Sequence, residues 1–338
     1  MTSLATDRFP GLTGEGARRL AHSDLRIVVV GAGGWLGLAT LELLHRLLGA
    51  DFHRRVRAFG SNSRTLQLRG GIGVEQSAAQ DLRRLAPAPS LVLHLAYLTQ
   101  EKAKGMSVEA YEAANRAISA NVLEALDPIG AVGVFVASSG AAYAADDPDA
   151  ATSLRLYGNL KREDERAFAA WAEPGDRRAA IARIFNLSGP YINKTSSYAL
   201  ACFIADVLAK RPVCVAATKP VHRSYVPISQ LMSVVFGVLT DDRTGPVVFD
   251  TAGERAHEIG EVAAEVAATL GGDMPVLRRP LSSDAADRYV GDGVTYDELR
   301  LRYDVGSASF TDQILETAQF MTEFLPTLGA DQESARDE

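Results

Sequence analysis

Residues 26–37 of this 338-residue chain decide how it folds, and they read Arg26-Ile27-Val28-Val29-Val30-Gly31-Ala32-Gly33-Gly34-Trp35-Leu36-Gly37. A short, mostly apolar run leads into glycines spaced three apart, and an apolar helical stripe follows at Leu41, Leu44 and Leu48. In a strand–turn–helix unit, this spacing allows a tight turn, the approach of a pyrophosphate and close packing of helix on strand. The alternative is a purely structural turn. We interpret the segment as a dinucleotide phosphate site made of Gly31, Gly33, Gly34, Trp35, Leu36 and Gly37.

The rest of the chain alternates short apolar runs with amphipathic stretches. Strands are expected at 26–30, 56–60, 91–96, 132–137 and 179–185, and helices at about 35–48, 108–126 and 156–172. This alternation is typical of an α/β fold with a Rossmann-type, doubly wound parallel sheet. Shorter, proline-punctuated segments after Asn186 predict a smaller C-terminal lobe that binds substrate.

The domain organisation follows from the same pattern. We expect a mobile N-terminal tail over 1–23 and an acidic tail over 328–338, because neither has an apolar periodicity. The dinucleotide-binding domain is expected to contain 24–186 plus about 224–252. The substrate-binding lobe is expected to contain about 187–223 plus 253–327.

Composition excludes several classes of protein. A net charge of −7 gives no electrostatic footprint for nucleic acid. Cys202 and Cys214 have neither metal-ligand spacing nor the number needed for a disulfide framework, so we expect no metal. No apolar run is long enough to span a membrane, and the N-terminal residues lack a signal-peptide core. We therefore expect a soluble, cytoplasmic protein that acts on a small molecule.

The segment Tyr157-Gly158-Asn159-Leu160-Lys161 suggests acid/base chemistry. Residues four apart share one face of a helix, so the Lys161 ammonium is expected to lower the pKa of the Tyr157 phenol. A phenol tuned in this way can exchange protons near neutral pH. The alternative for the pair alone is a solvated lysine beside a half-buried tyrosine.

The end of the second expected strand bears on the choice of cofactor. An NAD site usually offers an acid to the ribose hydroxyls at this place. Residues 58–64 contain no acid, but they include Ser61 and Arg64, which could hold a 2′-phosphate. We therefore favour NADP, with NAD as the alternative if Arg64 is only a surface residue.

Several motifs in order along residues 26–325 resemble the extended short-chain dehydrogenase/reductase family, which includes sugar-nucleotide epimerases, dehydratases and reductases. Besides the glycine turn and Tyr157/Lys161, they are the strand 91–96, Asn115 on the next helix, Val136-Ala137-Ser138-Ser139 with Tyr143, the segment 183–190, and Arg223-Ser224-Tyr225-Val226-Pro227-Ile228. The resemblance implies that Leu95 and Ala96 lie beside the nicotinamide ribose. It also implies a structural role for Asn115.

The resemblance further implies roles at the reacting centre. Ser139 would hold the substrate oxygen, Tyr157 would transfer the proton and Lys161 would bind the nicotinamide ribose, with Ser138 as the fallback for Ser139. Tyr143 would form a wall of the substrate site. Asn186 would contact the sugar or phosphate and Arg223 the diphosphate; Arg279, next to Arg278, is the candidate for a second diphosphate arginine.

Departures from the family pattern narrow the reaction. Family dehydratases carry an Asp-Glu pair after the catalytic hydroxyl residue, whereas Gly140 and Ala141 stand there, which argues against dehydration. We rank first an NADP-dependent ketoreductase acting on a nucleotide-linked keto-deoxysugar. The alternative is an NAD-dependent sugar-nucleotide epimerase, and a non-catalytic dinucleotide-binding protein comes third.

Assembly is the last expectation. The helix at 108–126 carries apolar residues at helical spacing, namely Ala114, Ile118, Val122 and Ala125. Equivalent helices of family members pair across a two-fold axis, so the resemblance implies a homodimer. The alternative is that this stripe faces only the protein's own sheet.

Overall fold

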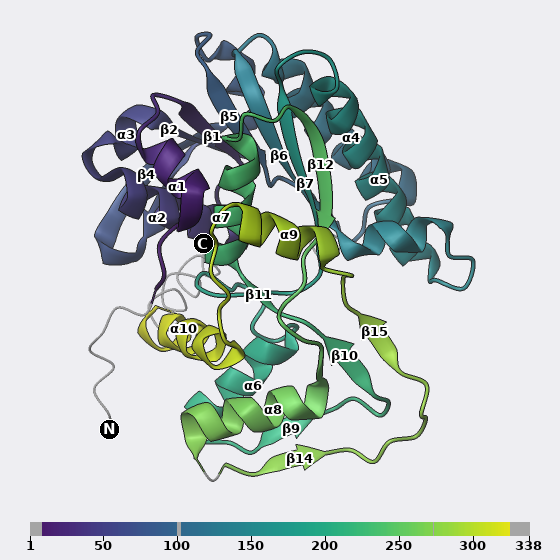
Figure 1. Cartoon of the computed structure of the whole chain (residues 1–338). Helices are drawn as coiled ribbons and strands as arrows, with labels where there is room; N and C mark the ends of the chain where they lie inside the picture. Colours follow the sequence, from purple (N-terminus) through teal and green to yellow (C-terminus); the bar gives the residue numbers. More distant parts are fainter. Residues whose placement is uncertain (1–8, 100–102, 273, 325–338) are drawn as a thin grey trace, which may run out of the picture.

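The computed structural model describes residues 9–99, 103–272 and 274–324, and its centre is an eight-stranded sheet (Figure 1). The strand order is β12-β7-β6-β5-β1-β2-β4-β3. The strands are β1 Arg26–Val30, β2 Val56–Gly60, β3 Arg64–Leu68, β4 Ile72–Ala78, β5 Ser90–His94, β6 Ala131–Ser139, β7 Arg178–Ile184 and β12 Gly245–Asp250. Only β3 runs antiparallel to its neighbour, so the predicted Rossmann-type fold is confirmed.

The order of strands reverses beside β1, because β2 follows on one side and β5 on the other. Val30 is in register with Phe59 and with His94, so the carboxyl ends of these strands lie side by side. Such a switch point is where doubly wound sheets bind ligands. The glycine turn after β1 and Leu95 after β5 both lie there.

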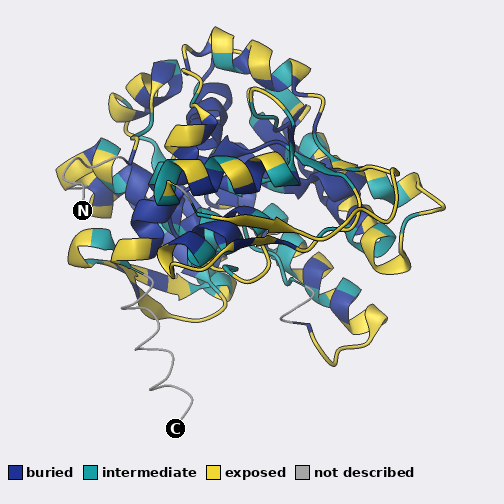
Figure 2. Ribbon diagram, turned by 90° about the horizontal axis from the view of Figure 1, so that it is seen from below, coloured by how far each residue is buried: buried dark blue, intermediate teal, exposed yellow. Residues whose placement is uncertain are grey.

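Helices cover both faces of the sheet. The helices α1 Gly14–Ala21, α2 Trp35–Leu48 and α7 Ile228–Leu239 cover one face, α4 Val108–Leu126 and α5 Thr152–Ala172 cover the other, and the short α3 Phe52–Arg55 leads into β2. Figure 2 shows the buried residues gathered in the sheet and on the inner sides of these helices.

These helices correct one expectation and bear on another. The predicted tail over 1–23 is wrong where the structure describes it, because α1 packs on α7 and fully buries Leu20. Val122 and Ala125 of α4 are buried against the sheet of the same chain, so this part of the apolar stripe packs within the monomer, and the homodimer stays a prediction. The predicted acidic tail over 328–338 lies outside the described residues.

A hairpin that the sequence analysis did not anticipate connects β2 to the parallel strand β4. Its strand β3 pairs antiparallel with β4, from Arg64 opposite Gln76 to Leu68 opposite Ile72. Buried and exposed residues alternate along β3, with Leu66 and Leu68 facing inward. The hairpin sets Arg64 and Gln76 side by side near the glycine turn.

The second lobe lies against the carboxyl end of the sheet (Figure 1). It contains the helices α6 Ala199–Leu208, α8 Ile259–Val266 and α10 Phe310–Glu323 and the short strands β8 Leu187–Ser188, β9 Val213–Val215, β10 Val221–Arg223, β11 Val226–Pro227, β13 His257–Glu258, β14 Val276–Arg278 and β15 Asp287–Tyr289. The helix α9, Val294–Arg302, instead contacts α7 and β12.

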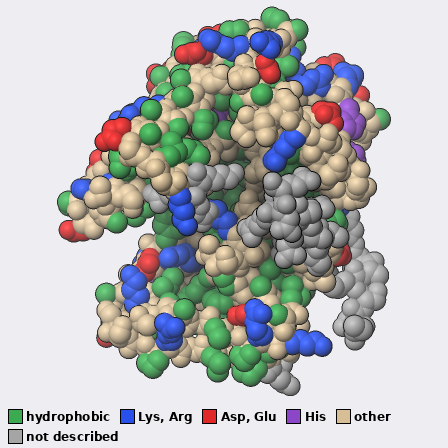
Figure 3. Space-filling model, turned by 180° about the vertical axis from the view of Figure 1, so that it is seen from behind, with side chains coloured by type: hydrophobic (Ala, Val, Ile, Leu, Met, Phe, Trp, Pro, Cys, Tyr) green, Lys and Arg blue, Asp and Glu red, His purple; other side chains and the backbone are tan. Residues whose placement is uncertain are grey.

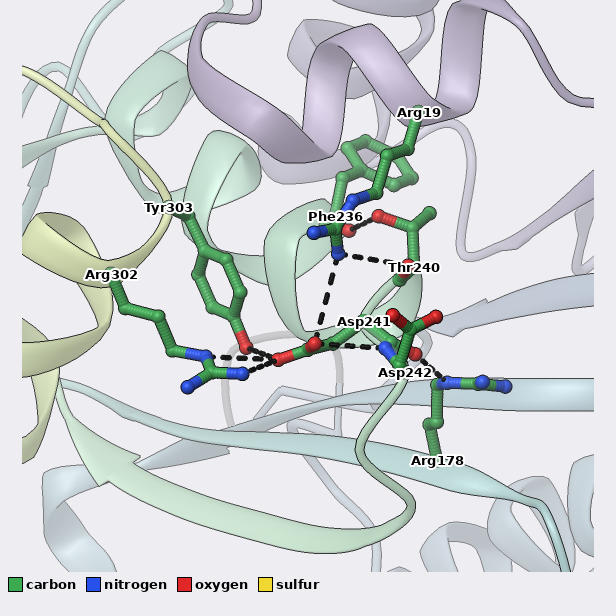
Figure 4. Close-up of polar contacts among 8 residues, drawn as sticks. All are labelled: Arg19, Arg178, Phe236, Thr240, Asp241, Asp242, Arg302 and Tyr303. Atoms are coloured by element: carbon green, nitrogen blue, oxygen red, sulfur yellow. Dashed lines mark hydrogen bonds and ion pairs between the residues drawn. The ribbon is translucent and has the colours of Figure 1, made fainter.

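A buried carboxylate at Asp241 joins α1, α7 and the end of α9 (Figure 4). Its Oδ2 accepts hydrogen bonds from Arg302 at 2.8 Å and from Tyr303 at 2.6 Å, and Arg19 lies 3.7 Å from its other oxygen. Burial acts to raise the pKa of Asp241, but the bonds from Tyr303 and Arg302 hold it below its usual value. The cluster therefore fixes α1 and α9 to the sheet domain.

Candidate active site

The glycine turn is shaped by close backbone contacts. Gly31 has a φ of +92°, and a Cβ there would lie 2.6 Å from the backbone nitrogen of Ala96. A Cβ at Gly37 would lie 2.4 Å from the carbonyl oxygen of Gly31. Only glycine fits these two positions, because both the left-handed conformation and the approach of α2 to the turn exclude a side chain. Gly34, the N-cap of α2, leaves the first turn of the helix without a side-chain cap.

A cavity of about 300 Å³ opens on this turn and is called the cofactor cavity below. It is lined by Val30, Gly31, Gly33, Gly34, Gly60, Ser61, Arg64, Gln76, Ala79, Leu95, Ala96, Tyr97, Leu98, Ile118, Asn121 and Val122. Most of the predicted cofactor residues are among them. Trp35 instead lines a different cavity, and Gly37 is buried against Gly31.

The electrostatics of the cofactor cavity are set by Arg64. No Asp or Glu is among the residues that line the cavity. The Arg64 guanidinium reaches over the turn, since a Cβ on Gly33 would meet it at 2.3 Å. Within the described part of the chain, the Arg64 side chain has no ion pair or hydrogen bond. An uncompensated guanidinium is a strong donor for a phosphate group.

Gln76 is a cavity residue that the sequence analysis missed. Its Nε2 donates to the carbonyl oxygen of Asn62 at 2.8 Å, and its Oε1 is buried without a partner among the described residues. A Cβ on Gly60 would lie 2.4 Å from the Gln76 amide, so the missing side chain makes room for it. An orphaned buried acceptor and an unpaired cation both fit a bound nucleotide.

Tyr157 and Lys161 share one face of α5, as predicted. The Lys161 side chain is buried, and its Nζ donates to the carbonyl oxygen of Ala137 at 3.0 Å. The same atom lies 3.8 Å from the centroid of the Tyr97 ring, whose edge meets Tyr157 at 5.3 Å between centroids. Tyr97 thus lies against both residues.

The pKa values differ from the sequence-based expectation. Burial raises the pKa of Tyr157 above its usual range, against the effect of a hydrogen bond with Ser139. Burial also lowers the pKa of Lys161 to about 8, while Asp164 and Glu165 act to raise it. The expected lowering of the phenol pKa by Lys161 is therefore absent, because the ammonium points to Ala137 and Tyr97.

Ser139 ends β6 and is buried. Its Oγ accepts a hydrogen bond from the backbone nitrogen of Ala141 at 3.2 Å, and it lies 3.1 Å from the Tyr289 hydroxyl. Ser138 faces the other side of the strand and donates to Glu165 at 2.5 Å. The fallback to Ser138 is therefore wrong, because alternation along the strand directs its side chain away from Tyr157.

Tyr143 and Asn115 have structural partners. The Tyr143 hydroxyl donates to Asp250 at 3.0 Å, its ring lies under the Arg183 guanidinium, and it lines none of the cavities described here. It is therefore no wall of the site in this structure. Asn115 accepts from the backbone nitrogen of Leu98 at 2.9 Å, which fixes the segment after β5 as expected.

A second cavity, of about 510 Å³, lies between α2 and the second lobe and is called the lobe cavity. Trp35, Phe185, Asn186, Tyr198 and Arg223 are among its lining residues, and most of the others are apolar. Figure 3 shows the surface hollowed between the sheet domain and this lobe. The predicted substrate residues Asn186 and Arg223 are thus brought together.

The cationic residues of the lobe have acidic partners or lie outside the cavity. Arg223 pairs with Asp287 at 3.2 Å. The predicted second arginine, Arg279, is exposed and does not line the lobe cavity, and its neighbour Arg278 is paired with Glu258.

A third cavity, of about 390 Å³, lies beside Tyr157 and is lined by Tyr97, Thr99, Tyr111, Ser153, Leu154, Tyr157, Lys194 and Tyr198. It shares Tyr97 with the cofactor cavity and Tyr198 with the lobe cavity. Tyr157 therefore lies where the three spaces approach one another. Such a junction can hold a cofactor and a substrate on either side of one proton donor.

Neither a metal centre nor a membrane segment is found in the described ranges. No group of three or more His, Cys, Asp or Glu residues could hold a metal ion there. No helix of the described chain is long and apolar enough to cross a membrane.

The comparison with protein families gives a match over residues 27–250 to the family described as the NAD dependent epimerase/dehydratase family. No curated protein matches the sequence.

Solved structures share the fold at low sequence identity. The UDP-N-acetylglucosamine 4-epimerase from Methanobrevibacter ruminantium has a TM-score of 0.69 and 18% identity, with 89% of this chain and 99% of that chain covered. The UDP-glucose 4-epimerase from Thermus thermophilus, in complex with NAD, has a TM-score of 0.65 and 20% identity, with 89% and 100% covered. TunA, an NAD-dependent NDP-hexosamine 5,6-dehydratase involved in tunicamycin biosynthesis, has a TM-score of 0.62 and 18% identity, with 88% and 98% covered.

Proposed function

This chain belongs to the NAD-dependent epimerase/dehydratase family, and on that premise we propose that it is an NADP-dependent ketoreductase acting on a nucleotide-linked keto-deoxysugar. The observation that carries the cofactor choice is the unpaired Arg64 in a cavity whose described lining contains no acid. A guanidinium favours a 2′-phosphate, whereas a carboxylate would have favoured the free hydroxyls of NAD.

The cofactor would be held by the glycine turn, Ser61, Arg64, Leu95 and Ala96, with Lys161 toward its nicotinamide end. When bound, NADPH supplies the hydride for the reduction. Two observations support the proposal that a nucleotide binds in this cavity. The buried Oε1 of Gln76 has no hydrogen-bond partner among the described residues, and the absence of a side chain at Gly60 leaves room for the Gln76 amide. These residues bind and orient, and the chemistry of proton transfer falls to the neighbouring hydroxyls.

The proton would come from Tyr157. Reduction of a ketone forms a carbon–oxygen single bond and needs one proton at the oxygen, which a phenol within hydrogen-bond reach can supply. Ser139 would donate a hydrogen bond to the same oxygen, while the Lys161 ammonium stays with Ala137 and Tyr97. The phenol then regains its proton from solvent.

The substrate would lie in the lobe cavity, with its carbonyl at the junction beside Tyr157. Asn186 and Arg223 would contact the nucleotide-linked part, while the carboxylate of Asp287 keeps Arg223 oriented. Tyr143 and Arg279 have no part in this proposal, since neither lines the cavity.

The second candidate is an NAD-dependent sugar-nucleotide epimerase. It is favoured by the three solved structures named above, of which two are 4-epimerases and one is a complex with NAD. Retained NAD in the purified protein, detected by ultraviolet absorbance, would favour this alternative. The homodimer and the cytoplasmic location also remain proposals, and sedimentation velocity tests the first.

The decisive test is cofactor binding by calorimetry. We expect NADPH to bind at least about tenfold more tightly than NADH, because a charged hydrogen bond to phosphate contributes about 1.5–3 kcal/mol. Arg64→Ala should remove this preference, and Arg84→Ala, at an exposed arginine outside the cavity, should keep it. Equal affinities in the wild type would reject the NADP assignment.

A further inference from the structure

Tyr289 brings a hydroxyl from the second lobe to the catalytic serine. It lies on β15, which pairs in parallel with β10 so that Tyr289 is opposite Arg223. Its ring packs on Phe185 with centroids 4.7 Å apart, and its hydroxyl lies 3.1 Å from the Ser139 Oγ. Ser139 and Tyr289 are 150 residues apart in the sequence, so this contact exists only when the lobe is docked.

The hydrogen-bonding capacity of Ser139 decides what this contact does. A serine hydroxyl has one proton to donate and two lone pairs that accept. The backbone N–H of Ala141 uses one lone pair, at 3.2 Å. When the Tyr289 hydroxyl donates to the second lone pair, the Ser139 proton is left to point toward Tyr157, with which Ser139 forms a hydrogen bond. Ser139 then acts as a donor toward the space beside Tyr157.

The opposite direction of the bond is poorer. If Ser139 donated to Tyr289, the Tyr289 proton would need an acceptor of its own. It has one in the carbonyl oxygen of Ile184, to which it donates at 3.5 Å, but this distance is long for a hydrogen bond between two oxygens. The geometry therefore favours Tyr289 as the donor.

Tyr289 is held in this position from several sides. Asn186 donates to its carbonyl oxygen at 3.4 Å, and Asp287, two residues earlier on β15, is paired with Arg223. The residues proposed to contact the substrate, Asn186 and Arg223, therefore also bond to the strand β15 on which Tyr289 lies.

We propose that Tyr289 is a positioning residue that fixes the Ser139 hydroxyl as a hydrogen-bond donor to the reacting oxygen of the substrate. The role in turnover rests on the proposed function, whereas the contact with Ser139 does not. The reaction itself is unchanged, because Tyr289 neither gains nor loses a proton over the cycle. Its removal leaves Ser139 free to rotate and to present a lone pair to the carbonyl oxygen.

The first experiment measures NADPH oxidation with dTDP- and UDP-linked 4-keto-6-deoxyhexoses as probes. Tyr289→Phe keeps the ring and should lower kcat about tenfold while KM changes less than about threefold. Combined with Ser139→Ala, it should cause little further loss, because both changes remove the same donor. Tyr296→Phe removes a buried hydroxyl bonded to Gln230, outside the cavities, and should keep wild-type turnover. Independent, additive losses would overturn the proposal.

The second experiment needs no turnover. In Ser139→Cys, a donor from Tyr289 should stabilise the thiolate at position 139. Alkylation of this thiol by iodoacetamide, followed by peptide mass spectrometry, should therefore be about tenfold faster at pH 7 than in the same variant with Tyr289→Phe. Equal rates would overturn the contact. If the wild type reduces none of the probes, the proposed function fails, and this comparison still decides whether Tyr289 donates to position 139.

Discussion

Lys161 is a buried cation whose replacement should stabilise the fold while it abolishes activity. Burial lowers its pKa from the usual 10.5 to about 8. At 1.36 kcal/mol per pH unit, this difference means that the charged form costs the folded state about 3 kcal/mol at neutral pH. The hydrogen bond to Ala137 and the contact with Tyr97 offset part of that cost. We therefore expect Lys161→Met to raise the free energy of unfolding by about 1–3 kcal/mol at pH 7.

The pH dependence gives this prediction its sign. Below pH 8 the lysine is protonated in both the folded and the unfolded chain, so the full cost is present. Between pH 8 and 10.5 the folded chain releases the proton first, and wild-type stability should rise relative to the variant. The advantage of Lys161→Met should therefore shrink as the pH rises through this range.

Urea unfolding followed by circular dichroism at a series of pH values measures the effect. Lys104→Met, at an exposed lysine, is the matched control and should change stability little at any pH. A Lys161→Met protein that is less stable than wild type at pH 7, or a difference that does not vary with pH, would refute the reasoning.

Three further substitutions test other parts of the structure. Asp241→Asn should lower the free energy of unfolding by about 2 kcal/mol at pH 7. This difference between variant and wild type should become smaller in acid, where Asp241 of the wild type is protonated. Urea titration at pH 7 and pH 3 measures the difference at each pH. Glu316→Gln should raise the free energy of unfolding by about 1–3 kcal/mol at pH 8. The reason is that burial raises the pKa of Glu316 to about 8, so wild-type stability falls as the pH rises from 4.5 to that value. A thermal unfolding curve that is unchanged at pH 8 would contradict this. Gly31→Ala should abolish NADPH binding in calorimetry, because its Cβ would overlap the backbone at Ala96, whereas Gly306→Ala, with open space around its Cβ, should bind normally.

Local patterns were sufficient for five of the eight strands of the sheet and for part of the site. The strand 26–30 and the helix 35–48 were predicted with the bounds of β1 and α2, because an apolar run, a glycine turn and an apolar helical stripe are all encoded within residues 26–48. The same is true of Tyr157 and Lys161, whose spacing along one helix needs no tertiary information.

Contacts between distant segments could not be predicted in this way. Tyr97 lies against Lys161 only because the end of β5 approaches α5, and that contact directs the ammonium away from the Tyr157 phenol. Tyr289 reaches Ser139 through the docking of the second lobe, and Asp287 pairs with Arg223 through the pairing of β15 with β10. No short motif signals any of these pairs.

The most direct test of the central proposal is the effect of Tyr157→Phe on ketone reduction. The substitution removes the proton donor and keeps the ring against Tyr97, so kcat for NADPH-dependent reduction of the nucleotide-linked ketone should fall at least about a hundredfold. The Kd for NADPH, measured by calorimetry on the same protein, should stay within about twofold of the wild-type value. A variant that reduces the ketone at a near wild-type rate would contradict the assignment of Tyr157 as the acid.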